Sequence, residues 1–177
     1  MIILATLFLL PDKVYGDSVQ TMKQLDNISN EALQMVRAYR YEDAKKLLNH
    51  FEKEFLNFTE SGQLFSMDEL RIITVSHDEA LEAIESSTID HQGRMDRVTQ
   101  FRLVMDAVVS THQPLWTEME GSIMTVFGGM KAAIQNGDNE EFYTNLDSFL
   151  ALYDVIYPSL KIDVNPEKFQ QLNTRVA

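Results

Sequence analysis

The residues with the clearest chemical potential in this sequence are its histidines and a short run of carboxylates. The four histidines are His50, His77, His91 and His112. None has an acidic residue three positions before it, so the sequence does not contain the Glu-x-x-His pairs that bind metal in helical di-iron proteins. The His-Glu-x-x-His pattern of zinc proteases does not occur either. We therefore predict no metal ligands and no cofactor.

The carboxylates stand beside His77, in a stretch whose apolar residues recur at helical spacing. His77 falls on the apolar face of that helix, so we expect a core histidine and not a ligand. Asp78, Glu82 and Glu85 share another face, without basic partners nearby in the sequence. Such a cluster can bind a divalent cation or a basic partner, although it is more often a solvated surface. We interpret these three residues as one part of a partner-binding face.

Nucleophilic catalysis has no support in the sequence. Cysteine is absent, which excludes thiol catalysis, disulfides and thiolate zinc sites. The sequence contains no Gly-rich phosphate loop, no Gly-x-Ser-x-Gly elbow and no Ser-x-x-Lys motif. We therefore expect a protein that is not an enzyme and that has no catalytic residues.

The adjacent glycines Gly128 and Gly129 are the least expected local feature. They fall inside a predicted helix, where each glycine costs about 1 kcal/mol relative to alanine. Gly121 precedes Gly128 by seven residues and lies on the same helical face. The structural interpretation is a kink or a close approach by another helix. The functional interpretation is a seat for a partner's helix, so Gly128 and Gly129 complete the candidate partner-binding face.

Length and charge limit the kinds of function. A chain of 177 residues with 45% hydrophobic residues can bury the core of one domain. Its formal net charge is −12, and its basic residues are sparse and scattered. Nucleic-acid binding needs clustered Lys and Arg to neutralise phosphates, so we exclude nucleic acid as a partner.

Helices must position all of these residues, because apolar residues recur at spacings of three and four along most of the chain. Ser66 followed by Glu69 has the sequence of a capping box, and Asn136-Gly137-Asp138 has that of a helix end and a new start. Pro114 is expected to open a helix, and Pro158 to end one before an extended stretch over 160–164. We expect helices over residues 18–39, 41–60, 67–85, 94–112, 114–135, 139–157 and 166–176.

The predicted fold class is all-α, with six main amphipathic helices in three αα-hairpins and a short C-terminal helix. The hairpins can pack as a helical bundle or as a short superhelix. The first and third hairpins carry similar apolar patterns 98 residues apart, as in Leu25 with Ile123 and Val36 with Ile134. The second helices of these hairpins correspond as well: Ala44, Leu48, Phe51, Phe55 and Phe58 match Phe142, Leu146, Phe149, Tyr153 and Ile156. This is either an internal duplication or a coincidence between amphipathic hairpins.

The first ten residues, MIILATLFLL, are apolar or small. This run is too short to span a bilayer and resembles the apolar region of a signal peptide, with cleavage expected after Val14-Tyr15-Gly16. The alternative is an N-terminal helix or strand that packs on the body. We therefore predict a hydrophobic leader over 1–16 and a single helical domain over 17–177, with Asp17 or Ser18 capping its first helix.

Several segments resemble the sporulation protein YpjB family of Bacillus and related spore formers. These segments are YRYEDAKKLLNHFEKEF, MDELRIITVSHDEALEA, QFRLVMDAV followed by QPLW, and YPSLKIDV. The resemblance covers nearly all of residues 17–177 and carries no catalytic motif. It implies a role in spore formation, with a signal sequence, a helical extracytoplasmic domain and a C-terminal membrane helix. This sequence departs from that pattern after Lys161, where no run of about 18 apolar residues follows.

Three functions are consistent with these observations. We expect first a non-enzymatic, membrane-anchored extracytoplasmic domain that binds a protein or envelope component during sporulation. The second is a metal- or small-molecule-binding helical domain that uses His77 with Asp78 and Glu82. The third is a cytosolic α-hairpin adaptor, which would keep its first sixteen residues. The sequence does not identify the partner or the oligomeric state.

Overall fold

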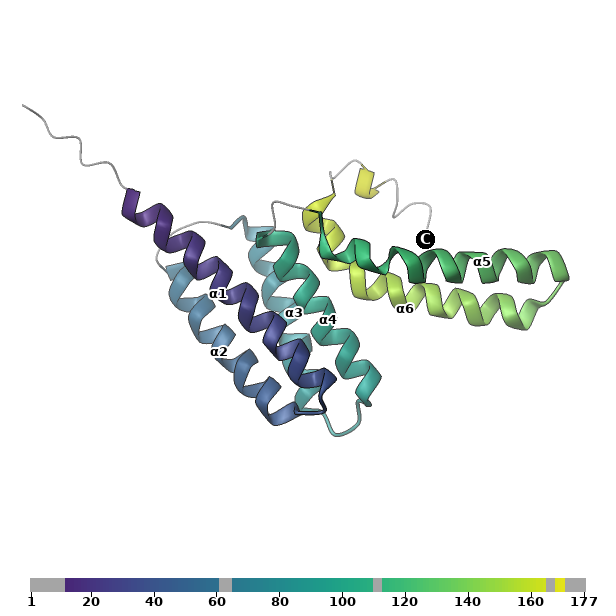
Figure 1. Ribbon diagram of the computed structural model, residues 1–177, viewed down its shortest axis with the longest axis horizontal. Coiled ribbons are helices and arrows are strands. Elements are labelled where there is room, and N and C mark those ends of the chain that lie inside the picture. Colours follow the sequence, from purple (N-terminus) through teal and green to yellow (C-terminus); the bar gives the residue numbers. More distant parts are fainter. Residues whose placement is uncertain (1–11, 61–64, 110–112, 165–167, 171–177) are drawn as a thin grey trace, which may run out of the picture.

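The computed structural model describes residues 12–60, 65–109, 113–164 and 168–170, with side chains from residue 19 onward (Figure 1). The described part of the chain consists of helices joined by short turns and contains no strand, as predicted. Its long helices are α1 (Asp12–Arg37), α2 (Tyr41–Glu60), α3 (Met67–Glu85), α4 (His91–Val109), α5 (Glu120–Asn136) and α6 (Asn139–Asp163). A short 3-10 helix, η1 (Leu115–Met119), precedes α5.

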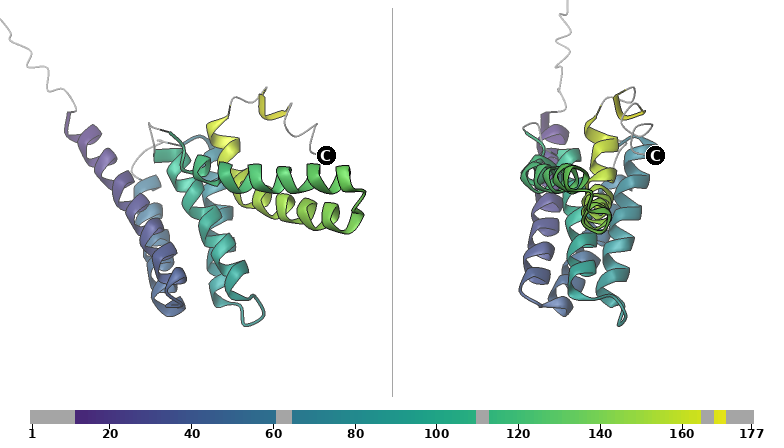
Figure 2. Two further views of the ribbon diagram at one scale, coloured as in Figure 1. Left: turned by 45° about the vertical axis from the view of Figure 1, so that its right-hand side comes forward. Right: turned by 90° about the vertical axis from the view of Figure 1, so that its right-hand side faces the viewer.

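The helices form a four-helix bundle with a projecting hairpin. In the bundle, α1 packs against α2 and α4, and α3 packs against α2 and α4. The hairpin of α5 and α6 joins the bundle where α6 crosses α4, and its outer end extends away from the other helices (Figures 1 and 2). The three predicted hairpins are therefore present, but they do not stack as three equal layers.

The bundle core is centred on aromatic residues of α2 and α4. Phe51 and Phe101 are almost completely buried, and their ring centroids lie 4.8 Å apart in an edge-to-face arrangement. Aliphatic side chains of all four helices surround them, including Leu25, Leu48 and Ile73. Burying each of these large side chains contributes about 1.5–3 kcal/mol, so this cluster supplies most of the stabilisation of the bundle.

A second, smaller core holds the base of the hairpin to the bundle. Leu103 of α4 packs with Val155, Ile156 and Leu160 of α6, and side chains of η1 lie against this group. Two hydrogen bonds fix η1 in place. The backbone N–H of Leu115 donates to Asp106 Oδ2 at 2.7 Å, and Trp116 Nε1 donates to Asp163 Oδ2 at 2.9 Å.

Two of the predicted helix boundaries are confirmed by their capping hydrogen bonds. Ser66 Oγ accepts from the backbone N–H of Glu69 at 3.2 Å, and Glu69 Oε2 accepts from the backbone N–H of Ser66 at 2.7 Å. This is the reciprocal capping box. Gly137 ends α5 at a φ of 70°, a region that favours glycine, and Asp138 then caps α6 by accepting from the N–H of Glu141.

The prediction that Pro158 ends its helix is wrong. Helix α6 continues through Pro158 to Asp163, so residues 160–163 are helical and not extended. Proline removes one backbone hydrogen bond from a helix interior. Its neighbour Leu160 belongs to the second core and Ser159 is also buried, and the packing of Leu160 with Leu103 of α4 offsets the missing bond.

Other boundaries differ for local reasons. Helix α1 begins at Asp12, so Asp17 and Ser18 lie inside it and do not cap it as predicted. Helix α4 begins at His91 because Asp90 Oδ1 accepts from the N–H of Gly93 at 2.8 Å. Pro114 opens η1, and α5 follows only at Glu120.

The predicted terminal segments are only partly visible. The short helix expected over 166–176 falls mostly outside the described residues, although 168–170 are helical. The apolar run 1–10 also lies outside them, so the leader stays a prediction. Among the described residues, no helix is long and apolar enough to cross a membrane.

Candidate functional site

The acidic face of α3 is less uniform in the structure than in the sequence. Lys45 of α2 reaches this face, and its Nζ lies 2.8 Å from Glu85 Oε1. This hydrogen bond with Glu85 raises the pKa of Lys45 above its ordinary value. Asp78 Oδ1 lies 3.1 Å from His77 Nδ1, and Glu82 is exposed. The three carboxylates share a helix face as predicted, but one of them already has a lysine partner.

His77 lies in the bundle core, as the sequence predicted. Its side chain is buried, and its Nε2 donates to the backbone carbonyl of Leu48 at 3.0 Å. The ring stacks on Phe51 and meets Phe101 edge to face, each at 5.5 Å between centroids. In the part of the chain that the structure describes, no three His, Asp or Glu side chains group as they would to hold a metal ion.

The two adjacent glycines of α5 have different surroundings. A Cβ added to Gly129 would lie 2.7 Å from Cγ of Asn145 on α6, closer than atoms of this kind approach one another. Gly129 therefore permits close packing of the two helices, which confirms the predicted close approach. Gly128 is exposed, and a Cβ there would meet no atom within 4 Å. Neither glycine lines either of the two surface pockets described below.

The α5–α6 hairpin leaves much of its apolar surface uncovered. Among the described elements, α5 packs only against α6 and η1, and Met130 and Ala133 are its only buried residues. Five large apolar side chains of this hairpin are exposed, and we call them the exposed hairpin residues. They are Met124 (62%), Phe127 (46%), Ile134 (68%), Tyr143 (62%) and Leu150 (45%).

A comparison with the first hairpin shows how unusual this exposure is. Val36 of α1 is fully buried, whereas Ile134, 98 residues later, is 68% exposed. Leu25 is likewise fully buried, and its counterpart Ile123 is only half-buried. The first hairpin is covered by α3 and α4, whereas no described helix covers the last one in the same way. A single helical hairpin cannot bury its own apolar face, so this surface is suited to a partner.

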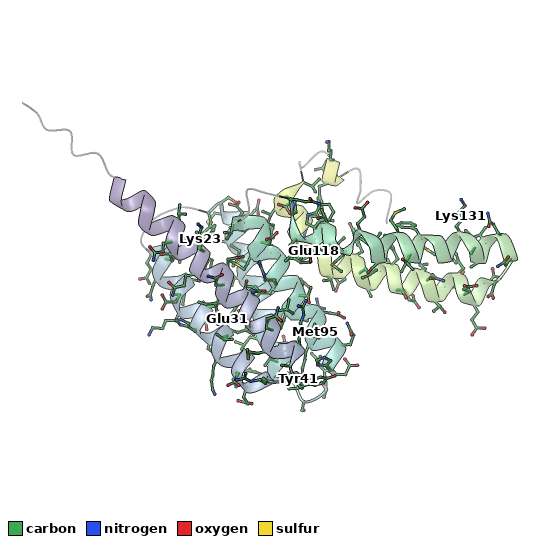
Figure 3. The ribbon with its side chains drawn as sticks, in the orientation of Figure 1. Lys23, Glu31, Tyr41, Met95, Glu118 and Lys131 are labelled. Carbon is green, nitrogen blue, oxygen red and sulfur yellow. The ribbon has the colours of Figure 1, made fainter. Side chains whose placement is uncertain are left out.

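A concave surface, which we call the α4–α6 notch, lies in the angle between the bundle and the hairpin. It has a volume of about 480 Å³ and is open to solvent. Its apolar lining comes from α4, η1 and α6: Met95, Met119, Ala151, Leu152 and Val155. Figure 3 shows Met95 on the half of α4 that lies below the hairpin, whereas Lys131 lies near the hairpin's outer end.

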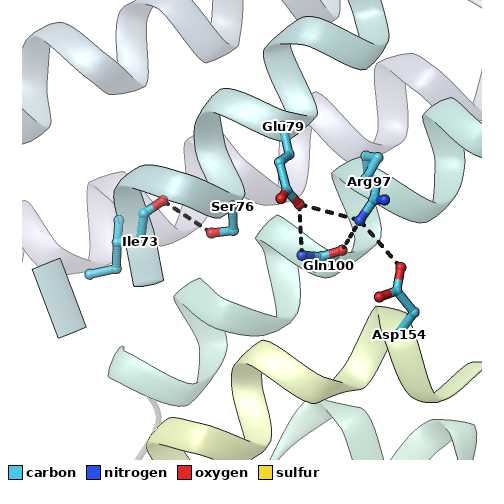
Figure 4. Close-up of polar contacts among 6 residues, drawn as sticks. All are labelled: Ile73, Ser76, Glu79, Arg97, Gln100 and Asp154. Carbon is cyan, nitrogen blue, oxygen red and sulfur yellow. Dashed lines mark hydrogen bonds and ion pairs between the residues drawn. The ribbon is translucent and has the colours of Figure 1, made fainter. Parts of the chain in front are cut away.

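A polar network on the other side of this junction ties the hairpin to the bundle (Figure 4). Arg97 Nη1 of α4 donates to Gln100 Oε1 at 2.9 Å and lies 3.3 Å from both Glu79 Oε2 of α3 and Asp154 Oδ2 of α6. Gln100 Nε2 donates to Glu79 Oε2 at 3.1 Å. The sequence analysis did not identify this network, because its members come from three helices and share no sequence motif.

The network lines a second surface pocket of about 350 Å³, together with Arg71, Tyr157 and Lys161. Its carboxylates already accept from Arg97 and Gln100. Lys161 lies over the ring of Tyr157, with Nζ 4.2 Å from the ring centroid. Such internally paired charges orient α6 relative to α3 and α4, so we assign the network a structural role.

Comparisons with known proteins identify one matching family and one similar protein. The family described as "Sporulation protein YpjB (SpoYpjB)" matches residues 22–177. The "Uncharacterized protein YpjB" of Bacillus subtilis (strain 168) is 28% identical over 158 residues, which are 88% of this chain and 60% of that relative. The chain therefore spans less than two thirds of the length of that protein. No solved structure matches this chain.

Proposed function

This chain belongs to the sporulation protein YpjB family, and we propose that it is a non-enzymatic helical domain that binds a protein or envelope component during spore formation. The observation that carries this proposal is the uncovered apolar surface of the α5–α6 hairpin. Monomeric proteins seldom leave contiguous apolar surface exposed without a function, and such surfaces mark interaction sites. The exposed hairpin residues are large apolar side chains of α5 and α6 that are at least 45% exposed.

The position of the hairpin supports the same proposal. Its base is held by the second core and by the Arg97 network, so the outer part projects from a fixed platform. A partner can therefore meet α5 and α6 without rearranging the bundle. The acidic face of α3 is a weaker candidate, since Lys45 already neutralises Glu85.

The proposed location is the extracytoplasmic side of a membrane in a spore-forming cell, with a membrane anchor outside the residues described. The apolar run 1–10 supports this location, because it has the composition of a signal-peptide core. The test is the N-terminal mass of the protein from its own cells, measured together with cell fractionation. A start near Asp17 in a membrane or outer fraction is expected. An intact Met1 in the cytosol would move the proposal to an adaptor inside the cell.

The binding role is tested by changing the exposed hairpin residues in the sporulating host. The variant Met124→Ser/Ile134→Ser removes two apolar side chains that are more than half exposed, so we expect normal helicity and normal protein levels. We expect fewer heat-resistant spores, because the partner loses apolar contacts. The matched control is Met67→Ser, at an apolar position on α3 that is 79% exposed. Equal spore yields from both variants would contradict the proposal.

A further inference from the structure

We propose that the α4–α6 notch binds an amphipathic helix of a partner protein whose apolar stripe is flanked by basic residues. This inference rests on the proposed function and specifies the site and the partner's chemistry. The notch is distinct from the exposed hairpin residues, because it lies where α6 meets α4.

The shape and lining of the notch suit a helix. A volume of about 480 Å³ can take side chains from one face of a helix, in the manner of helix-in-groove recognition. Two of the lining residues, Met95 and Met119, are flexible and polarisable, and methionines of this kind adapt to an inserted side chain. Ala151 and Ser148 have small side chains, so the backbone of a bound helix can approach this part of α6 closely.

The openness of the notch argues for an occupant larger than a small molecule. The notch is open to solvent, so a small ligand would leave one side exposed. A helix lying along α6 would continue beyond the notch onto the half-buried and exposed surface of the hairpin. Its additional contacts there would bury apolar area that the described chain leaves uncovered.

The charges around the notch select a basic partner. Its lining contains the carboxylate of Asp96 and no Lys or Arg. Residues 115–163, which include η1 and the hairpin, contain eight acidic and two basic residues. The carboxylate in the notch and the net negative charge of the elements beside it attract a cationic helix and steer its approach. This negative charge also disfavours a second copy of the chain, because each copy carries a net charge of −12.

The test uses the full chain labelled with 13C at its methionine methyl groups, titrated with two synthetic helical peptides. Both peptides are about 18 residues long and carry the same leucine stripe, but one has lysines beside the stripe and the other has glutamates. We expect the lysine peptide to shift the methyl signals of Met95 and Met119 and to leave that of Met67 unchanged. We expect the glutamate peptide to bind at least about tenfold more weakly.

The variant Ala151→Arg places a long cationic side chain in the notch at an exposed helix position, so the fold should be retained. It should weaken binding of the lysine peptide about tenfold, by steric overlap and by repulsion. Ala132→Arg is the matched control, since Ala132 is also exposed on a helix but does not line the notch. This control should bind like the unchanged chain.

Several outcomes would overturn the inference. Equal binding of the two peptides, or an Ala151→Arg variant that binds normally, would exclude this site or this chemistry. Shifts at Met124 without shifts at Met95 and Met119 would move the contact to the exposed face of α5, which retains the proposed function and removes the notch. Concentration-dependent shifts of Met95 and Met119 without peptide would identify a second copy as the occupant. The Met124→Ser/Ile134→Ser spore assay tests the proposed function separately.

Discussion

Asp26 of α1 and Arg102 of α4 form an ion pair across the bundle, with Oδ1 and Nη1 2.6 Å apart. The arginine side chain is 11% exposed, and the aspartate side chain is 25% exposed. Asp106 lies on the other side of the same guanidinium, 3.8 Å from Nη2. One arginine therefore compensates two carboxylates that are largely withdrawn from water.

We predict that Arg102→Met destabilises the protein by about 2 kcal/mol, because it leaves Asp26 partly buried without its cation. Methionine keeps much of the side-chain volume, so lost packing contributes little. The measurement is the free energy of unfolding from urea denaturation. Arg71→Met is the control, since Arg71 pairs with Asp68 on the exposed surface and should cost less than about 0.5 kcal/mol. Equal losses in both variants would contradict the prediction.

Two substitutions of His77 test the role of this residue in the core. We predict that His77→Phe costs about 1 kcal/mol, because phenylalanine keeps the contacts with Phe51 and Phe101 but loses the hydrogen bond to Leu48. His77→Ala should cost about 3 kcal/mol, since it also creates a cavity. Urea denaturation of the three proteins gives both values. A His77→Phe variant as unstable as His77→Ala would show that the hydrogen bond, and not the packing, dominates.

Tyr39 follows α1 at a φ of 60°, where a bulky residue is strained. Its ring stacks on His91, with centroids 3.9 Å apart. We predict that Tyr39→Ala destabilises the protein by about 1 kcal/mol, because the stacking is lost while the strain remains. Tyr39→Gly should be more stable than Tyr39→Ala by about 1 kcal/mol, since glycine tolerates a positive φ. Thermal unfolding compares the two variants, and identical midpoints would count against the strain.

The glycines of α5 should respond in opposite ways to alanine. We predict that Gly128→Ala stabilises the protein by about 0.5–1 kcal/mol, because the site is open and alanine favours the helix. Gly129→Ala should lose this gain, because its Cβ meets the side chain of Asn145. The double variant Gly129→Ala/Asn145→Ala removes that obstacle and should recover stability. Urea denaturation is the readout, and equal stabilisation by both single variants would contradict the predicted contact.

Burial raises the pKa of Asp163 above its ordinary value of 3.8, although the hydrogen bond from Trp116 opposes this shift. The folded protein therefore holds this proton to a higher pH than the unfolded chain does. Its contribution to stability is present at low pH and is lost as pH rises from about 3.8 through the raised pKa. Asp163→Asn should make the free energy of unfolding fall less steeply over this range.

The control for this pH dependence is Asp147→Asn, which removes one charge from an exposed position of the same helix. Its pH profile should run parallel to that of the unchanged protein. Thermal unfolding measured in steps from pH 3.5 to about 7 separates the profiles. A profile of Asp163→Asn that is as steep as that of Asp147→Asn would rule out Asp163 as the titrating group.

Most of the fold could be predicted because helix signals are local. The spacing of apolar residues, the Ser66 capping box and the Gly137-Asp138 boundary all act within about one turn of helix. The same spacing placed His77 on a buried face. The prediction for Pro158 is wrong because the local effect of proline on a helix is outweighed by the packing of Leu160 with Leu103 of α4, a contact that the sequence does not show.

The sequence by itself determined the all-α class, the three hairpins and the residues that share each helix face, since these depend on neighbours three and four positions apart. Only the tertiary structure decided which faces are covered. It placed Lys45 beside Glu85, joined Asp26 to Arg102, and left the α5–α6 hairpin exposed while covering the similar first hairpin. These outcomes depend on where helices cross, and crossings are set by packing between segments far apart in the chain.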